Sequence, residues 1–178
     1  MNGSGVEAQT VSMGLLFVRV VFGLVMAAHG AQKLLGWFGG YGLTQTGEFF
    51  VQIGLWQGRA FASLASLMEV TSGFLVALGF LGPIGPALMI SVMVVAMITV
   101  HWKNGPFAAK NGVELPLLYA TMAIGLAFTG FGRYSLDELL GIGGRWSPAV
   151  TLIVLGIGLA GGLGNAAIRR RSPSAAGD

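Results

Sequence analysis

Residues 18–37 read VRVVFGLVMAAHGAQKLLGW, an apolar stretch that nevertheless contains Arg19, His29 and Lys33. A helix of about 20 apolar residues is needed to cross roughly 30 Å of hydrocarbon, and charged groups are costly inside that layer. With a turn of about 100° per residue, the three polar residues fall in one sector of a helix, together with mostly small residues. The stretch therefore predicts a membrane helix that carries one polar face.

The composition of the whole chain is that of a membrane protein. Of the 178 residues, 54% are hydrophobic and 10% are charged, whereas an ordinary soluble domain has about 25% charged residues. Apolar runs that are long enough, or nearly long enough, to span a bilayer occupy residues 13–35, 59–81, 84–102, 115–131 and 148–168. We therefore predict an all-α integral membrane protein with five spans, of which the fourth is at the short limit.

Several classes of chemistry and of partner are excluded by what the sequence lacks. Cysteine is absent, which excludes disulfides, iron–sulfur clusters and thiolate metal sites. Residues 1–12 contain no Lys or Arg, so they do not resemble a secretory signal peptide, and we expect them to form a short outer tail before the first span. The net charge is +3, but the basic residues lie beside the apolar runs and form no single basic face, which argues against a nucleic-acid partner.

The basic residues also predict an orientation in the bilayer. With five spans the termini lie on opposite sides, and the positive-inside rule is best satisfied when residues 169–178 form a basic cytoplasmic tail. Seven of the ten basic residues then lie on the cytoplasmic side, two lie outside, and Arg19 lies in the membrane. We therefore expect a multi-pass protein with its N-terminus outside and its C-terminus in the cytoplasm.

The connecting segments contain helix signals of their own. A weakly amphipathic stretch within residues 39–58 predicts a short interfacial helix on the cytoplasmic side. Residues 79–86 allow only a tight outer turn, so the second and third spans form an antiparallel hairpin. The sequence SLDE at 135–138 predicts a capping box that opens one or two helical turns, and Ser147 before Pro148 predicts the start of the last span.

Small residues are regularly spaced in the last apolar run. Gly156, Ala160 and Gly164 recur every four residues, with Gly158 and Gly162 beside them. Such spacing allows two helices to approach closely. Two interpretations stay open: a face through which the protein forms a homo-oligomer, or a face that packs against the protein's own bundle.

Glu69 is the most unusual residue of the second run, because it lies near the bilayer midplane, where ionisable groups are functional candidates by default. Its neighbours one and two turns away on the helix are small, which predicts that its carboxylate points into the bundle. If the first span is centred near Gly23, Arg19 lies about 6 Å from the midplane, within reach of this carboxylate. We therefore predict an Arg19–Glu69 ion pair, which is either an inert clamp or part of a functional site.

Other polar residues are expected near the cytoplasmic interface, namely His29, His101 and Glu114. Two histidines on two helices could ligate haem, but the expected place of His101 at the membrane boundary disfavours haem. A quinone head group needs only a His or Lys donor, a carboxylate that exchanges protons and an apolar slot. The sequence predicts no metal site. The candidate functional residues are Arg19, His29, Lys33, Glu69, His101 and Glu114, with quinone as the candidate cofactor.

Several separated motifs resemble those of the DoxX family of small bacterial membrane proteins. They are Arg19, HGAQKLLGWFGG (29–40), EVTSGFLVALGFLGP (69–83), HWKNG with GVELPLLY (101–119) and GFGRYSLDELL (130–140). The resemblance implies a DoxX-like four-helix transmembrane bundle over residues 13–140, to which residues 141–168 add one C-terminal transmembrane helix. It also implies a bacterial inner (plasma) membrane and a place in a membrane oxidoreductase complex, since family names refer to DoxD, a subunit associated with thiosulfate:quinone oxidoreductase.

The leading hypothesis is a quinone-associated integral subunit of a redox complex. In it, Arg19 and Glu69 form the midplane charge pair, while His29 and Lys33 hydrogen-bond the quinone head group. One alternative is a non-catalytic membrane anchor for soluble redox partners, and another is a proton-coupled small-molecule transporter, for which a midplane acid is suitable. The sequence leaves open the substrate, the electron donor and whether the protein is an enzyme.

Overall fold

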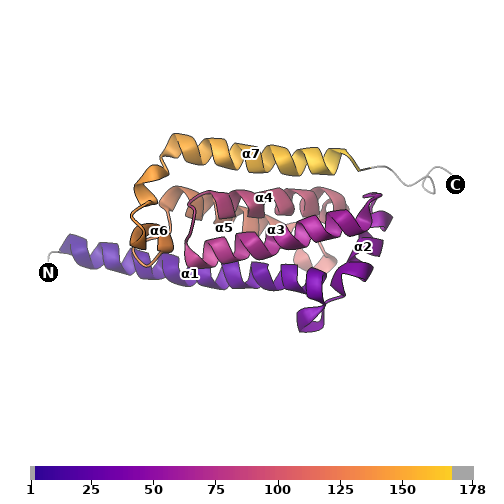
Figure 1. Cartoon of the computed structure of the whole chain (residues 1–178), viewed down its shortest axis with the longest axis horizontal. Coiled ribbons are helices and arrows are strands. Elements are labelled where there is room, and N and C mark those ends of the chain that lie inside the picture. The colour runs from indigo at the N-terminus through magenta and orange to yellow at the C-terminus, as the bar shows by residue number, and fades with distance from the viewer. Residues whose placement is uncertain (1–2, 170–178) are drawn as a thin grey trace.

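The computed structural model describes residues 3–169, and within that range the chain is helical with no strand. The main helices are α1 (Gly3–Leu35), α3 (Gly58–Leu78), α4 (Ile84–Ala96), α5 (Glu114–Thr129) and α7 (Pro148–Ala167). They lie side by side along one direction, with the start of α1 and the end of α7 at opposite ends of the bundle (Figure 1). Apart from Arg169, the basic tail expected at 169–178 lies outside the described residues.

Short helices occupy the two ends of the bundle. At the end where α1 stops lies α2 (Gly42–Gln52), and α6 (Leu136–Leu139) lies at the opposite end (Figure 1). A π-helical segment, η2 (Met97–His101), continues α4. Single 3₁₀ turns complete the connections: η1 (Trp37–Gly39), η3 (Trp102–Asn104), η4 (Ala108–Lys110) and η5 (Gly143–Arg145).

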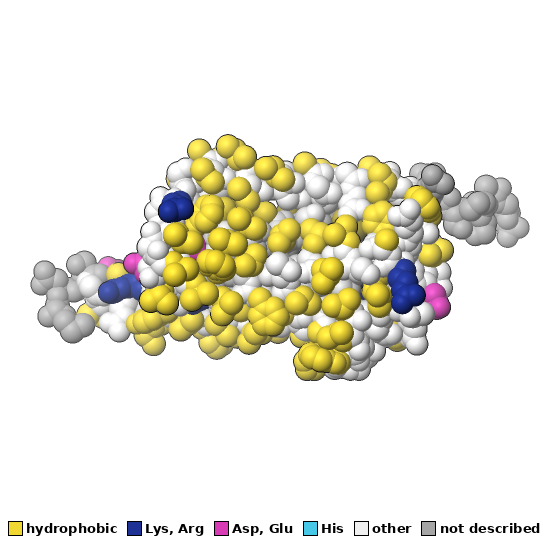
Figure 2. Space-filling view, in the orientation of Figure 1, with side chains coloured by type: hydrophobic (Ala, Val, Ile, Leu, Met, Phe, Trp, Pro, Cys, Tyr) yellow, Lys and Arg dark blue, Asp and Glu magenta, His cyan; other side chains and the backbone are white. Residues whose placement is uncertain are grey.

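The expected all-α membrane architecture is confirmed. Among the described residues, four helical segments are long and apolar enough to cross a membrane: Gly5–Leu35, Gly58–Leu78, Ile84–Asn104 and Pro148–Ala167. The other apolar helix, α5, has 16 residues and therefore reaches about 24 Å, just short of a full hydrocarbon layer. Large apolar side chains cover the middle of the face seen in Figure 2, and charged side chains lie towards its two ends.

The first helix begins earlier than the sequence predicts. Residues 3–12, expected to be a tail, are helical and continue into the span as one helix of 33 residues. This N-terminal extension projects beyond the bundle in Figure 1. Because α1 is this long, the middle of α3 lies beside the C-terminal part of α1 and not beside the middle of α1.

Helices α1 and α3 touch through small residues, and these contacts set their register. A Cβ added to Gly23 would lie 2.5 Å from the carbonyl oxygen of Gly73, and one added to Gly30 would lie 2.6 Å from that of Ser66. Such distances leave no room for a side chain, so the two backbones are in direct contact, as small residues permit in membrane helices. The middle of α3 is therefore opposite Gly30, and Gly23 is opposite its last two turns.

The stripe of small residues on α7 is divided between two faces. Gly158 and Gly162 pack on α4, because added Cβ atoms would lie 2.4 Å from the carbonyl oxygen of Ala87 and 2.7 Å from that of Ser91. Gly156 and Gly164 have nothing within 4 Å of an added Cβ, so they face away from the protein's own bundle. A homo-oligomer through Gly156, Ala160 and Gly164 stays a prediction.

The helix signals in the connections are confirmed. The Ser135 hydroxyl accepts a hydrogen bond from the backbone N–H of Glu138 at 3.2 Å, at the start of α6. The Ser147 hydroxyl accepts from the N–H of Val150 at 3.4 Å, with Pro148 in the first turn of α7. The tight turn between α3 and α4 forms the expected antiparallel hairpin.

Candidate functional site

Glu69 forms its ion pair with Lys33, and the predicted pair with Arg19 is wrong. The Lys33 ammonium donates to both carboxylate oxygens, at 2.6 Å for Oε2. Glu69 is only 2% exposed, whereas the side chain of Lys33 is 33% exposed. The reason is register: Lys33 lies about 21 Å further along α1 than Arg19, and the Gly30 contact places that later part of the helix beside Glu69.

Arg19 lies at the opposite end of the α1–α3 contact, near the last turn of α3. It is 2% exposed, and its guanidinium donates to the carbonyl oxygen of Ala77 at 2.6 Å and to that of Tyr134. The Ala77 carbonyl belongs to the last turn of α3, where carbonyls have no partner within the helix and carry partial negative charge. Arg19 therefore ties the end of α3 to the loop after α5, and its role in the structure is to join these elements.

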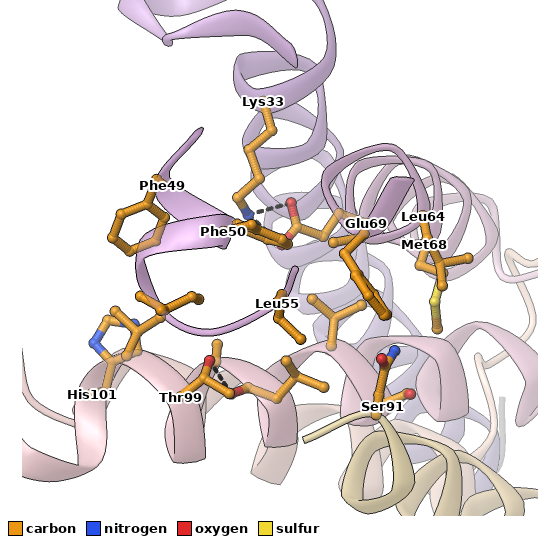
Figure 3. Close-up of a pocket in the computed structure, with 18 residues that line it drawn as sticks. Lys33, Phe49, Phe50, Leu55, Leu64, Met68, Glu69, Ser91, Thr99 and His101 are labelled. Atoms are coloured by element: carbon orange, nitrogen blue, oxygen red, sulfur yellow. Dashed lines mark hydrogen bonds and ion pairs between the residues drawn. The ribbon is translucent and has the colours of Figure 1, made fainter. Parts of the chain in front are cut away.

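Lys33 and Glu69 line a cavity of about 190 Å³. Figure 3 shows the pair at one side of this space, with Phe50 and Leu55 beside it and with Thr99, His101 and Ser91 along the opposite helix. Most of the lining is apolar and comes from α2, α3 and α4. The apolar lining residues are Phe49, Phe50, Ile53, Leu55, Phe61, Leu64, Ala65, Met68, Val92, Val95, Ala96 and Val100.

Helix α2 closes the cavity because it is held tightly on the start of α3. A Cβ added to Gly58 would lie 2.0 Å from the carbonyl oxygen of Gly47, so the two backbones meet directly. This contact presents Phe49 and Phe50 to the cavity, together with the 2% exposed Leu55 that follows the helix. The short helix expected here is present, its place at the membrane interface stays a prediction, and it forms one wall of the cavity.

The opposite wall includes the π-helical segment η2. Thr99 and His101 belong to this segment and line the cavity. The Thr99 hydroxyl donates to the carbonyl oxygen of Val95 at 2.8 Å, and His101 Nδ1 lies 2.8 Å from the carbonyl oxygen of Asn111. π-Helical turns within α-helices are rare and frequently mark functional sites.

Three of the predicted site residues do not line this cavity: Arg19, described above, His29 and Glu114. His29 is exposed, meets the ring of Tyr119 edge-on at a centroid distance of 6.3 Å, and has Nδ1 at 3.2 Å from Gln32 Oε1. Glu114 is exposed and accepts from the N–H of Ala108 at 2.7 Å. The cavity thus brings together Lys33, Glu69 and His101, and it does not bring the two histidines into one site.

Sequence reasoning missed three polar residues of the cavity wall: Ser91 on α4, Thr99 on η2 and Asn165 on α7. Asn165 carries a signal that could have identified it, because it is the one amide side chain in an otherwise apolar last run. Ser91 lies in the run MISVMVV and carries no such signal, because a single serine is common in membrane helices.

A second buried carboxylate stabilises the loops at the α6 end of the bundle. Asp137 is 4% exposed and accepts from the N–H groups of Leu81 and Gly82, at 2.8 and 2.7 Å, and from Trp146 Nε1 at 3.0 Å. It therefore joins the α3–α4 turn to the segment before α7. A hollow of about 370 Å³ lies beside it, lined by Arg133 and Glu138 among others.

Comparison with known proteins assigns the family. Neither the curated proteins nor the solved structures yield a match to the chain. The family model named DoxX matches residues 14–102, which is half of the chain. This matched segment contains α1 from residue 14 onward together with α2, α3 and α4, and with them the Lys33–Glu69 pair and most of the cavity wall. The protein is therefore a member of the DoxX family.

Proposed function

We propose that this protein is a quinone-binding integral subunit of a redox complex in a bacterial plasma membrane, and that the quinone head group enters the cavity beside Lys33 and Glu69. The observation that carries the proposal is a buried ion pair at the wall of an otherwise apolar cavity between membrane helices. Intramembrane ionisable residues are retained mostly where they act on a ligand, an ion or a proton. The redox role also agrees with the family resemblance.

The size and lining of the cavity suit a ring-shaped apolar head group. Its volume of about 190 Å³ compares with an engineered apolar cavity of about 150 Å³ that binds benzene. Aromatic and aliphatic side chains from three helices would pack on the ring faces. The lipid between the helices is the natural place for a hydrophobic quinone tail.

Lys33 and Glu69 supply the polar chemistry that such a head group requires. A lysine ammonium has three donors, and the carboxylate of Glu69 accepts from Lys33 at each of its two oxygens, so one donor stays free for a quinone carbonyl. When bound, a quinone accepts two electrons and two protons. Glu69 would take up protons from water and pass them to the quinone one at a time, and the two electrons would come from a redox-protein partner.

Binding of a short-tailed 1,4-benzoquinone to the purified full-length protein in detergent tests this proposal. We expect the wild-type protein to bind it in a calorimetric titration, and to release endogenous quinone on solvent extraction. Lys33→Ala should weaken binding by about 10- to 100-fold, the value of a hydrogen bond to a charged group. Lys110→Ala, a change of an exposed lysine at the same end of the bundle, is the matched control and should bind like the wild type.

Three measurements on this protein and its variants distinguish the proposal from its two alternatives: quinone binding, co-purification of partners and uptake into proteoliposomes. A wild-type protein that neither retains nor binds quinone would contradict the proposal. A membrane anchor would keep its redox partners during purification when Lys33 and Glu69 are substituted, and would lose them when residues 133–146 are replaced by an unrelated linker. A transporter would show uptake driven by a pH gradient in proteoliposomes, abolished by Glu69→Gln.

A further inference from the structure

The wall of the cavity formed by α4 and α7 contains a hydroxyl that has no hydrogen-bond partner among the described residues. Ser91 is 6% exposed and lines the cavity, and within the described residues its Oγ makes no hydrogen bond. Serines and threonines in helices commonly return their hydroxyl to the carbonyl four residues earlier. Ser66 does so at 2.6 Å and Thr99 at 2.8 Å in this structure.

The Ser91 hydroxyl is available to a ligand in the cavity. Its oxygen keeps accessible surface, since among the described residues Arg19 Nε is the one buried side-chain nitrogen or oxygen atom without a partner. The oxygen lies on the α7 side of α4, because a Cβ added to Gly161 would lie 3.7 Å from it. It has no described acceptor of its own and can donate to a ligand there.

Asn165 supplies a second unpaired polar group at the same wall. Its carboxamide lines the cavity and makes no hydrogen bond within the described part of the chain. Its position follows from helix packing, because Gly162 rests on the backbone of Ser91 and Asn165 lies one turn further along the same face of α7. An amide in a lipid-embedded helix is costly unless it meets a polar partner.

We propose that Ser91 and Asn165 form a second polar anchor, which holds the far carbonyl of a para-quinone whose near carbonyl accepts from Lys33. This inference rests on the proposed function and specifies its ligand: a flat ring with two hydrogen-bond acceptors at opposite ends. One anchor belongs to α1 and α3, and the other belongs to α4 and α7. The helix α7, which lies outside the 14–102 segment matched by the family model, thus contributes directly to ligand binding.

Substitution of the anchor in the full-length protein, with a short-tailed 1,4-benzoquinone as the probe, tests the inference. Ser91→Ala and Asn165→Leu should each raise the dissociation constant by about fivefold, the value of one neutral hydrogen bond, and the double substitution should raise it further. The matched controls are Thr121→Val and Leu163→Ala, which change exposed side chains that do not line the cavity. Both should bind like the wild type.

Infrared spectra of the bound probe give a readout that a purely structural role would not change. Hydrogen bonding lowers the stretching frequency of a carbonyl group, so with one carbonyl labelled with ¹³C at a time, both should be lowered in the wild type. In the double variant only the carbonyl at the Ser91–Asn165 end should return towards its free frequency. In Lys33→Ala the other carbonyl should do so.

The possible outcomes distinguish this inference from the proposed function. If Ser91→Ala and Asn165→Leu bind the probe normally and with unchanged carbonyl bands, while Lys33→Ala fails, the second anchor is wrong and quinone binding stands. If the wild type does not bind the probe at all, both proposals are overturned. Weakened binding by the anchor variants, with the selective shift of one carbonyl band, supports both.

Discussion

At Glu69 a carboxylate is held almost out of contact with solvent and lipid by a lysine from the neighbouring helix. Such a pair adds little net stability, because both charges lose favourable solvation, but removing one partner leaves the other buried and unpaired. Lys33 is the more exposed partner. Removal of Lys33 therefore leaves a buried unpaired charge at Glu69, whereas removal of Glu69 leaves a lysine that is partly exposed. The pair is thus better suited to acting on a ligand than to stabilising the bundle.

This asymmetry predicts different effects for single and double substitutions. Lys33→Met should lower the free energy of unfolding by about 3–5 kcal/mol, because it leaves the Glu69 carboxylate buried alone. Adding Glu69→Leu should restore most of that stability, since two apolar side chains replace two charges of similar size. Denaturant or thermal unfolding of the purified variants in the same detergent measures both effects.

In these variants we expect quinone affinity and the free energy of unfolding to change independently. The double variant Lys33→Met/Glu69→Leu should remain stable and should bind the short-tailed benzoquinone about 10- to 100-fold more weakly than the wild type, because the charged donor is gone. A double variant that is as unstable as Lys33→Met alone would show that the pair acts mainly as a clamp between α1 and α3.

The inward orientation of Glu69 could be predicted from the sequence, but its partner could not. The small residues around Glu69 define its face whatever the neighbouring helix is. The partner depends on the register between two helices, which is set by the backbone contacts of Gly23 with Gly73 and of Gly30 with Ser66. Arg19 and Lys33 lie in the same sector of α1, so helical periodicity alone could not choose between them.

At the scale of the helices, close approach of backbones determines which elements form the cavity. The Gly47–Gly58 contact fixes α2 on α3, and the contacts of Gly158 and Gly162 fix α7 on α4. If α7 moved away from α4, the cavity would lose the side chain of Asn165 and gain an opening to the lipid. The packing of α7 is therefore a condition for the proposed ligand site.

A pair of leucine substitutions on α7 tests this condition. Gly158→Leu should displace α7, because an added Cβ would lie 2.4 Å from the carbonyl oxygen of Ala87. We expect a loss of thermal stability and a loss of quinone affinity of about fivefold or more, the value of the Asn165 hydrogen bond. Gly156→Leu is the matched control, because nothing lies within 4 Å of its added Cβ.

The Gly156→Leu control can change the oligomeric state as well as the packing of α7. Size-exclusion chromatography with light scattering should accompany the titrations, because Gly156 lies on the face predicted to form a homo-oligomer. Equal stability and affinity of Gly158→Leu and the wild type would contradict the assigned role of the α4–α7 contact.

The sequence predicts a helix boundary correctly where it contains a capping residue, a proline or a glycine at that boundary. Ser147 with Pro148, the capping box at Ser135 and the glycine after Thr129 give boundaries close to those of α7, α6 and α5. The predicted start of α1 is too late, because residues 3–12 are not part of the apolar run and yet contain no proline that would prevent a helix. The π-helical segment η2 had no sequence signal, since it depends on how the end of α4 packs.

At the scale of the whole molecule, the two ends of the bundle differ in charge. The end that contains α2 and the end of α7 has five described basic residues: Lys33, Arg59, Lys103, Lys110 and Arg169. The opposite end, with α6, has Arg133 and Arg145 together with the acidic residues Glu7, Asp137 and Glu138. Because Lys and Arg near the ends of spans are retained on the cytoplasmic side, this asymmetry favours the orientation with the N-terminus outside.

The absence of cysteine from the sequence makes that orientation directly measurable, because a single introduced cysteine is the only thiol in the protein. Gly144→Cys places an exposed thiol at the α6 end, and Lys110→Cys places one at the α2 end. With a membrane-impermeant maleimide applied to intact cells, converted to spheroplasts if an outer membrane is present, we expect Gly144→Cys to be labelled and Lys110→Cys to be protected. After the membrane is permeabilised, both should react. Labelling of Lys110→Cys and protection of Gly144→Cys in intact cells would reverse the assigned orientation, and would place the entrance of the Lys33–Glu69 cavity nearer the outer surface.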